Sequence, residues 1–130
     1  MRKLIAMCVM IALIAGFAAL DLVFTTRFYT SAHNNLVAAE QSIRQNREML
    51  ANEETILLTH KANNDWEKGK KRLMMLVNHN VVRQVDEKFV SLIEQVESDN
   101  YIDAIVTVNV LNSQIKDLRE ENYPLLRNLL

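Results

Sequence analysis

The chain has 130 residues, 49% of them apolar, a length that suits one domain together with an anchor segment. Its formal net charge of −1 excludes the basic excess that nucleic-acid binding requires, so no nucleic-acid partner is expected. Two glycines, one proline and one cysteine exclude a turn-rich β fold and an internal disulfide, and they favour an all-α fold of long helices with short connections.

The first predicted element is an apolar helix from Leu4 to Phe24, interrupted only by Asp21. Its 21 residues would span ~31 Å at ~1.5 Å per residue, which matches the ~30 Å hydrocarbon core of a bilayer. Asp21 lies near enough to the end of the segment for its carboxylate to reach the membrane interface. We therefore expect contact with membrane lipid through this helix.

Charge beside the apolar segment predicts its orientation. Arg2 and Lys3 precede the segment, and positive residues stay on the cytoplasmic side of a membrane. The sequence thus predicts a single-pass protein of the cytoplasmic membrane. Residues 1–26 would form a cytoplasmic tip and transmembrane anchor, and residues 27–130 an extracytoplasmic helical domain.

A cleavable signal peptide is the alternative for the same segment. Gly16 and Ala18 are small residues at the −3 and −1 positions of a cut after Ala18. Such a cut would release a mature chain beginning at Ala19. The apolar run continues beyond this site as far as Phe24, which favours a retained anchor.

The next predicted helix begins near Thr30, and its candidate N-caps are Thr30, Ser31, Asn34 and Asn35. Its expected buried face follows near-heptad spacing through Leu36, Ala39, Ile43, Leu50 and Leu57. Asn52 and the two glutamates after it either cap a second helix or lie within one continuous helix. The following helical stretch contains Trp66 and ends at residues 78–80, which favour a turn.

Two later stretches repeat apolar residues at alternating spacings of three and four. The first comprises Val82, Val85, Phe89, Leu92 and Val96, and the second Tyr101, Ala104, Val108, Leu111, Ile115 and Leu118. A polar turn at residues 98–100 joins them. Residues 105–110 alternate like a strand, but a lone strand has no partner here, so we predict a helix. The expected architecture is a transmembrane helix followed by a three- or four-helix antiparallel bundle or hairpin.

The C-terminal end is predicted to leave the last helix at Pro124 and to continue as an apolar tail. Leu129 and Leu130 would be a liability if exposed to water. They either fold back onto the bundle or dock on another protein.

A basic run and the single tryptophan are the candidate interaction residues. Lys68, Lys70, Lys71 and Arg72 could contact anionic head groups or an acidic partner, or simply form a solvated face offset by neighbouring acids. Trp66 could anchor a partner or pack against neighbouring helices.

His79 is a further candidate, since seven residues separate it from Asp86 and the two could share a helix face. The alternative is a turn histidine and a surface carboxylate. No two of the three histidines have the i, i+4 spacing of a helical metal site, so no metal is expected.

Motifs for catalysis are missing from the sequence. It contains no phosphate-cradling glycine loop, no nucleophile elbow and no His-Glu-x-x-His pair. Its carboxylates are scattered over predicted helix faces. We therefore expect no enzymatic activity and no cofactor.

Several motifs occur together along the chain: Asp65-Trp66-Glu67-Lys68, His79 within Val-Asn-His-Asn, the Asp99-Asn100 turn with Ala104, and the terminal Arg127-Asn128-Leu129-Leu130. In these motifs the chain resembles the family called domain of unknown function 4363, and the resemblance is strongest from Trp66 onward. The resemblance implies a short bacterial protein with one N-terminal span, a helical remainder and no established activity. Because genes of such proteins often lie beside that of a multi-span membrane protein, it also implies a partner of that kind.

Three functional hypotheses follow. The leading one is a non-enzymatic accessory or interaction subunit of an envelope or membrane complex. The second is an extracytoplasmic sensor or ligand-binding bundle, which would need a cavity between helices lined by polar groups such as His60, His79 or Asn109. The third is an exported, cleaved, chaperone-like helical protein.

Overall fold

The computed structural model describes residues 1–75 and 78–122, and this part of the chain contains four α helices and no strand. The helices are α1 (Arg2–Gln45), α2 (Glu53–Leu73), α3 (His79–Glu97) and α4 (Tyr101–Asn122). The predicted all-α fold is confirmed. Residues 105–110, with their strand-like alternation, lie within α4.

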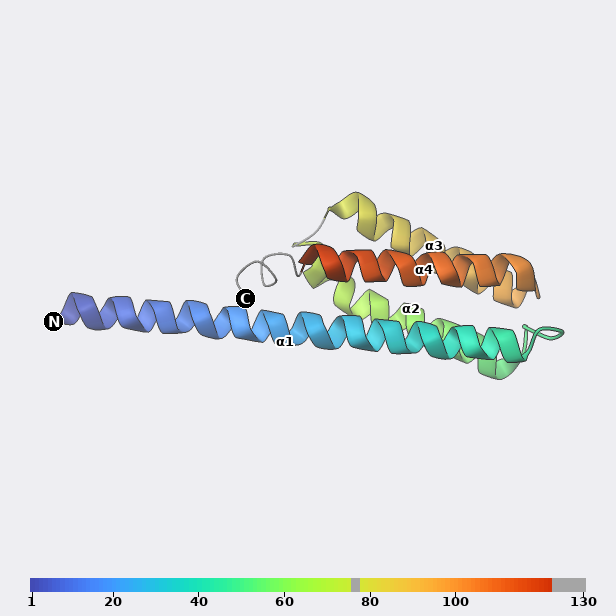
Figure 1. Ribbon diagram of the computed structural model, residues 1–130, viewed down its shortest axis with the longest axis horizontal. Helices are drawn as coiled ribbons and strands as arrows, with labels where there is room; N and C mark the ends of the chain where they lie inside the picture. The colour runs from blue at the N-terminus through green and yellow to red at the C-terminus, as the bar shows by residue number, and fades with distance from the viewer. Residues whose placement is uncertain (76–77, 123–130) are drawn as a thin grey trace.

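Helix α1 is one uninterrupted helix of 44 residues, ~66 Å long at ~1.5 Å per residue. Its N-terminal half projects alone, and its C-terminal half packs beside the other three helices (Figure 1). The helix start predicted near Thr30 and Ser31 is therefore wrong. No glycine or proline lies between Phe24 and Leu36 to end the helix, so the apolar segment continues directly into the bundle. The domain boundary expected after residue 26 falls inside a helix.

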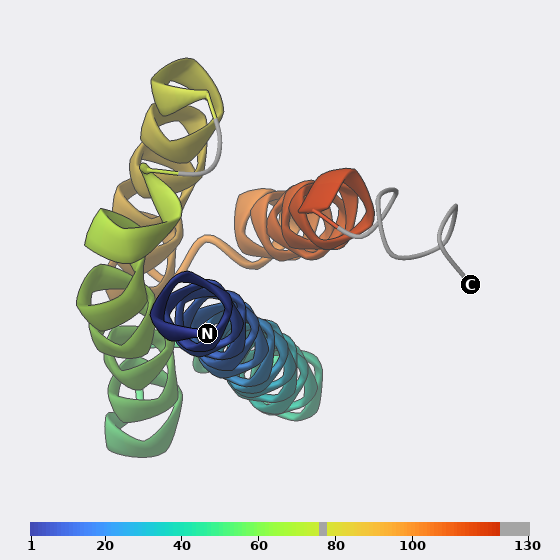
Figure 2. The same ribbon diagram turned by 90° about the vertical axis from the view of Figure 1, so that its left-hand side faces the viewer.

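The four helices form an antiparallel bundle in which each helix packs against the next and α4 returns to α1. Viewed along the long axis, α1 and α4 lie opposite the layer made by α2 and α3 (Figure 2). The short connections after α1 and α3 require this up-down-up-down order, because a short loop can join only antiparallel neighbours.

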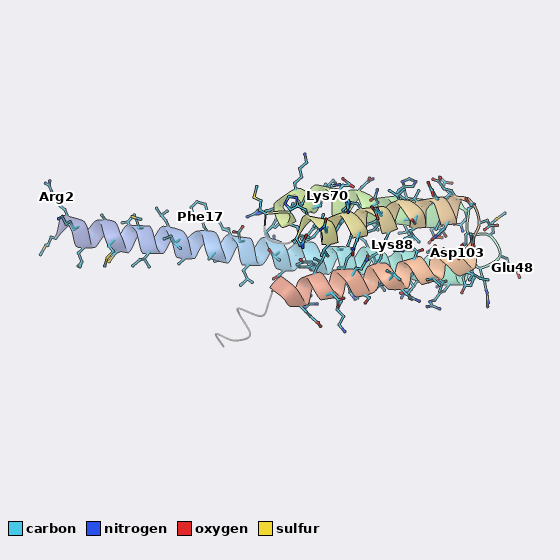
Figure 3. All side chains as sticks on the ribbon, turned by 90° about the horizontal axis from the view of Figure 1, so that it is seen from above. Arg2, Phe17, Glu48, Lys70, Lys88 and Asp103 are labelled. Atoms are coloured by element: carbon cyan, nitrogen blue, oxygen red, sulfur yellow. The ribbon has the colours of Figure 1, made fainter. Side chains whose placement is uncertain are left out.

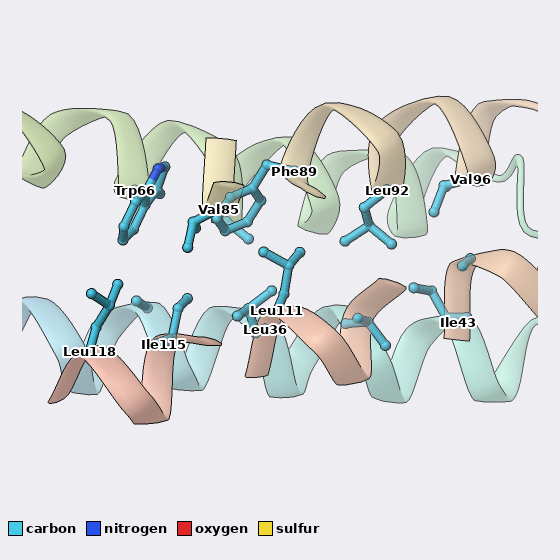
Figure 4. Packing of buried hydrophobic residues seen from close by; sticks show 14 of the residues in the cluster. Leu36, Ile43, Trp66, Val85, Phe89, Leu92, Val96, Leu111, Ile115 and Leu118 are labelled. Carbon is cyan, nitrogen blue, oxygen red and sulfur yellow. The ribbon is translucent and has the colours of Figure 1, made fainter. Parts of the chain in front are cut away.

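The core is formed by apolar side chains that repeat at spacings of three and four on each helix. Trp66, Val85 and Phe89 face residues of α1 and α4 such as Leu36 and Leu111 (Figure 4). The stripes predicted for α3 and α4 are confirmed at every position except Tyr101, which is only half-buried. Burial of these large side chains contributes ~1.5–3 kcal/mol each and is the main source of stability.

The buried face of α2 differs from the predicted one. Leu57 is 66% exposed, and the core positions of α2 are Thr55, Thr59, Ala62, Trp66, Gly69 and Leu73. Three of these six are threonine or glycine, so hydrophobicity alone does not mark the face. The Thr59 hydroxyl donates to the Thr55 carbonyl at 2.7 Å, and the Thr55 hydroxyl pairs with that of Ser42, also at 2.7 Å. These bonds satisfy hydroxyls that would otherwise be costly to bury.

Asparagines begin the second and third helices. The Asn52 side chain accepts from the Thr55 backbone N–H, which settles the alternative in favour of a separate helix α2. Asn78 accepts from the Asn80 N–H, so His79 and Asn80 belong to the first turn of α3 and not to a loop. Pro124 and the tail that includes Leu129 and Leu130 lie outside the described residues.

The turn between α3 and α4 is closed by Asp99, whose φ of 60° is left-handed. The Asn100 N–H donates to the Gln95 carbonyl at 2.8 Å and the Asp99 N–H to the Val96 carbonyl at 3.1 Å, which is the Schellman ending usually built on glycine. The Asp99 carboxylate accepts from the Leu50 N–H at 2.5 Å. This bond explains the residue, because aspartate tolerates the left-handed backbone and also ties the two loops together.

Substituting Asp99 with alanine is expected to lower the free energy of unfolding by about 1–3 kcal/mol, because alanine strains the left-handed backbone and leaves the Leu50 N–H without its acceptor. Urea unfolding of the full-length chain in detergent micelles, followed by circular dichroism, measures the change. Asp99→Asn keeps an acceptor oxygen and should stay within about 0.5 kcal/mol of the wild type. Equal losses in the two variants would contradict the assigned role of the side chain.

Candidate functional site

The N-terminal half of α1 has no covering within the described residues. Its large apolar side chains are exposed on all sides, from Leu4 at 64% to Val23 at 49%. A continuous apolar surface of this size is stable only when lipid or protein covers it. By length and composition, α1 is long and apolar enough to cross a membrane, and no other helix in the described part of the chain is.

Where α1 enters the bundle, a column of aromatic rings connects three helices. Phe24 stacks on Phe28 with 6.3 Å between ring centroids, since the i, i+4 spacing places both on one face of α1. Phe28 lies 5.7 Å from Trp66 of α2, which in turn lies 6.0 Å from Phe89 of α3. These offset ring pairs each contribute about 0.5–1.5 kcal/mol beyond their buried area.

Gly69 allows α1 and α2 to approach closely at this column. A Cβ atom at residue 69 would lie 2.1 Å from Cε2 of Phe28, far inside van der Waals contact. Gly69 is the only glycine outside the apolar N-terminal segment, and Phe28 occupies the space that its missing side chain leaves. The ring of Phe28 can therefore lie directly against the backbone of α2.

Polar groups around Trp66 fix its position. The indole Nε1–H donates to Oδ1 of Asp86 at 2.6 Å, and Nζ of Lys70 donates to Oδ2 of the same carboxylate at 3.2 Å. Nζ of Lys70 also donates to Glu67 at 2.9 Å. The hydrogen bond to Glu67 raises the pKa of Lys70 above its ordinary value, together with the Asp86 carboxylate and against the effect of burial. The lysine therefore stays charged and holds Asp86 in place.

Arg72 joins the end of α2 to the apolar segment. Its guanidinium donates to the Asp21 carboxylate, 51 residues away in the sequence, and lies 4.2 Å from the centroid of the Phe24 ring. A cation in the last turn of α2 also interacts favourably with the helix dipole. We call these contacts the junction, defined by Asp21, Phe24, Phe28, Trp66, Gly69 and Arg72.

A groove of about 570 Å³ opens on the surface between α1 and α2 beside these residues. Its lining combines apolar side chains of α1, including Leu20 and Val23, with the charged groups of Arg27, Lys68 and Asp65. Arg72 is also part of its lining. We call it the junction groove.

One residue of the basic run takes part in the hydrogen bonds around Trp66, and the other three lie on the surface. Lys70 is largely enclosed by its two acidic partners (Figure 3). Lys68, Lys71 and Arg72 are exposed on α2. Of the four, Lys68 and Arg72 line the junction groove.

The remaining sequence-derived candidates do not meet in one place. Trp66 is fully buried, so it packs between helices and is not exposed to a partner. His79 is exposed at the start of α3, His60 pairs with Glu97 on the surface at 3.2 Å, and Asn109 is exposed on α4. None of these last three residues lines the junction groove or the second cavity, of about 500 Å³ between α1 and α4, whose polar lining includes His33, Asn112 and Lys116.

The sequence did not predict that five further residues come together around Trp66 and Arg72: Asp21, Phe24, Phe28, Gly69 and Asp86. Two local signals were available: the i, i+4 pair of phenylalanines and the solitary glycine of the bundle. Among the described residues, no group of three or more His, Cys, Asp or Glu side chains is placed to hold a metal ion.

Comparison with known proteins gives a single result. No curated protein and no solved structure shows a significant match to the chain. The family described as domain of unknown function (DUF4363) matches residues 23–129. This range begins at the junction and includes almost the whole bundle, so the chain belongs to the DUF4363 family.

Proposed function

We propose that this protein is a non-enzymatic, single-pass accessory subunit that holds a rigid helical bundle in a fixed position on the outer face of the cytoplasmic membrane. There it binds another membrane or envelope protein. The observation that carries the proposal is the continuity of α1, which passes from its apolar segment into the bundle without a break. The junction then fixes α2 against α1, so the bundle cannot swing freely about its anchor.

The orientation rests on charge and on the position of the junction. Arg2 and Lys3 precede the apolar segment, which favours a cytoplasmic N-terminus. Asp21 and Arg72 form an ion pair at the other end, where the polar interface of a bilayer would lie. The bundle would then stand directly on the outer membrane surface.

The outer side of α4 supports a role in protein binding. Ile102 and Val106 are 74% and 56% exposed, and their i, i+4 spacing places them on one face. The opposite side of the helix packs in the core, so the first two turns of α4 are apolar on both sides, a property of helices with neighbours on both faces. A partner contacting Ile102 and Val106 would supply the second neighbour.

The titratable groups of the described residues favour a structural role over catalysis. Asp86 is engaged by Trp66 and Lys70, and the described contact of His60 is with Glu97. Such pairs join helices or lie on the surface, and they do not converge on one pocket as a general acid and base would.

Photocrosslinking in native membranes tests the proposal. p-Benzoylphenylalanine at Val106 of the full-length chain should give one discrete adduct with a protein of the same membrane. The same group at Lys61, an exposed position of α2 diagonally opposite α4, should give none. Adding Ile102→Glu should remove the Val106 adduct and leave the helical circular dichroism unchanged.

Absence of an adduct from Val106 and from a second probe at Ile102 would overturn the interaction role. The intact mass of the membrane-extracted chain provides the control for anchoring. A chain that retains Met1 supports the anchor, whereas an N-terminus at Ala19 would support the exported alternative. Asp21, Phe24 and Phe28 all follow Ala18, so the junction would survive such a cut.

A further inference from the structure

We propose that the junction groove binds the head group of an anionic phospholipid, with the phosphate between Arg27 and Lys68 and the upper acyl chain along Leu20 and Val23. This inference rests on the membrane anchoring proposed above. It adds a specific lipid site to the general contact of the apolar segment with the bilayer and to the proposed binding of another protein.

The charge of the groove is positive, and two of its cations, Arg27 and Lys68, are not held by a close ion pair. Arg72 is engaged by Asp21, and the acid within the groove, Asp65, accepts from Asn35 Nδ2 at 2.6 Å. Lys68 lies 4.0 Å from Asp65 with 81% of its side chain exposed, so this pair is loose.

Arg27 makes no ion pair within the described residues and lines the groove from α1, as Lys68 does from α2. A phosphate between them would receive charge-assisted hydrogen bonds from both helices. An arginine and a lysine from two helices that the junction holds together form a pre-organised anion site.

The vertical position of the groove matches the layers of a bilayer. Leu20 and Val23, which form its apolar end, belong to the exposed apolar segment of α1. Arg27 lies three residues beyond Phe24, the last residue of the apolar segment, which is ~4.5 Å further along the helix axis. The head-group layer on each side of the hydrocarbon core is ~5–8 Å thick, so Arg27 and Lys68 would lie at the level of the lipid phosphates.

The volume of the groove suits one head group. About 570 Å³ lies within the ~300–1,000 Å³ range of sites that bind small ligands. Its apolar end borders the surface that lipid would cover, so a bound lipid could keep its acyl chains in the bilayer. A free phosphate ion would leave this apolar end unused, and a membrane lipid is therefore the ligand that fits.

Lipid selectivity of the reconstituted full-length chain tests the proposal. Vesicles of zwitterionic phosphatidylcholine carry a trace of spin-labelled phosphatidylglycerol or spin-labelled phosphatidylcholine, and electron spin resonance gives the protein-bound fraction of each. Because these vesicles have almost no surface charge, a preference for phosphatidylglycerol reports a local site. Wild type should prefer phosphatidylglycerol, and Arg27→Gln or Lys68→Gln should each reduce the preference about five-fold, the effect of one basic residue near a lipid surface.

Lys71→Gln is the matched control, because Lys71 is an exposed lysine on the same turn of α2 that does not line the groove. It should leave the preference within a factor of about two, since its charge lies outside the site.

Equal losses for Lys68→Gln and Lys71→Gln would overturn the site in favour of general attraction. A wild-type chain that floats with the vesicles but shows no preference would overturn the lipid site alone. A chain that does not float would overturn the anchoring itself. Millimolar inorganic phosphate should not displace the lipid, and displacement would show a free anion to be the ligand.

Discussion

Trp66→Ala is expected to lower the free energy of unfolding by about 3–5 kcal/mol, the largest effect of any single substitution proposed for this chain. The side chain is fully buried, contacts Phe28 and Phe89, and donates to Asp86. Alanine would leave a large cavity between three helices and remove one of the two donors to the Asp86 carboxylate. Urea unfolding of the full-length chain in detergent micelles, followed by circular dichroism at 222 nm, measures the loss.

Trp66→Phe separates the two contributions. It keeps an aromatic ring against Phe28 and Phe89 but removes the indole N–H that donates to Asp86. The expected loss is about 1–2 kcal/mol, from one charge-assisted hydrogen bond and a small cavity. A Trp66→Ala variant that unfolds within about 1 kcal/mol of the wild type would show that the aromatic column does not stabilise the bundle.

Gly69→Ala is expected to destabilise the bundle by about 1–3 kcal/mol, although alanine is ordinarily about 1 kcal/mol better than glycine within a helix. The sign reverses because the new Cβ would lie 2.1 Å from Phe28 Cε2, and the ring has Phe24, Tyr29 and Trp66 around it. The displaced ring should also change the environment of the only tryptophan. Unfolding by urea and the emission maximum of Trp66 provide two independent measurements.

A double-mutant cycle with Phe28→Ala tests whether the contact with the Phe28 ring causes this loss of stability. In a Phe28→Ala background the space beside residue 69 is vacant, so Gly69→Ala should become neutral or stabilising by up to about 1 kcal/mol. Gly16→Ala is the matched control in the same chain, because nothing lies within 4 Å of its added Cβ. It should leave the unfolding of the bundle unchanged. Stabilisation by Gly69→Ala in the wild-type background would contradict the close contact.

These variants also bear on function, because the junction sets the position of the bundle relative to the apolar segment. Arg27 on α1 and Lys68 on α2 can act on one phosphate only if the two helices keep their spacing. Gly69→Ala should therefore weaken lipid selectivity even though residue 69 carries no charge. The bundle core further from the junction, around Leu92 and Val96, should be little affected, since distant sites act nearly independently.

The class of the fold, the apolar segment and the inner faces of α3 and α4 could all be predicted from the amino-acid sequence. These features depend on local regularity: a long apolar run, spacings of three and four, and a polar turn at residues 98–100. The five residues of the α3 stripe are buried as predicted, because no polar residue interrupts the stripe: Val82, Val85, Phe89, Leu92 and Val96. Composition was equally informative, since a chain with so few glycines and prolines cannot form many tight turns.

The length of α1 and the buried face of α2 depend on how the helices pack against one another. Thr30 and Ser31 suit a helix cap or a helix interior, and their continuation within α1 depends on packing against the bundle. The inner face of α2 contains Thr55 and Thr59, whose burial is possible only because hydrogen-bond partners are placed beside them. The pairs Asp21–Arg72 and Trp66–Asp86 are far apart in the sequence, and no periodicity of one helix can indicate which residue of another it will meet. The candidate site consists almost entirely of such pairs. It therefore depends on how the helices pack, although the helices themselves could be predicted from the sequence.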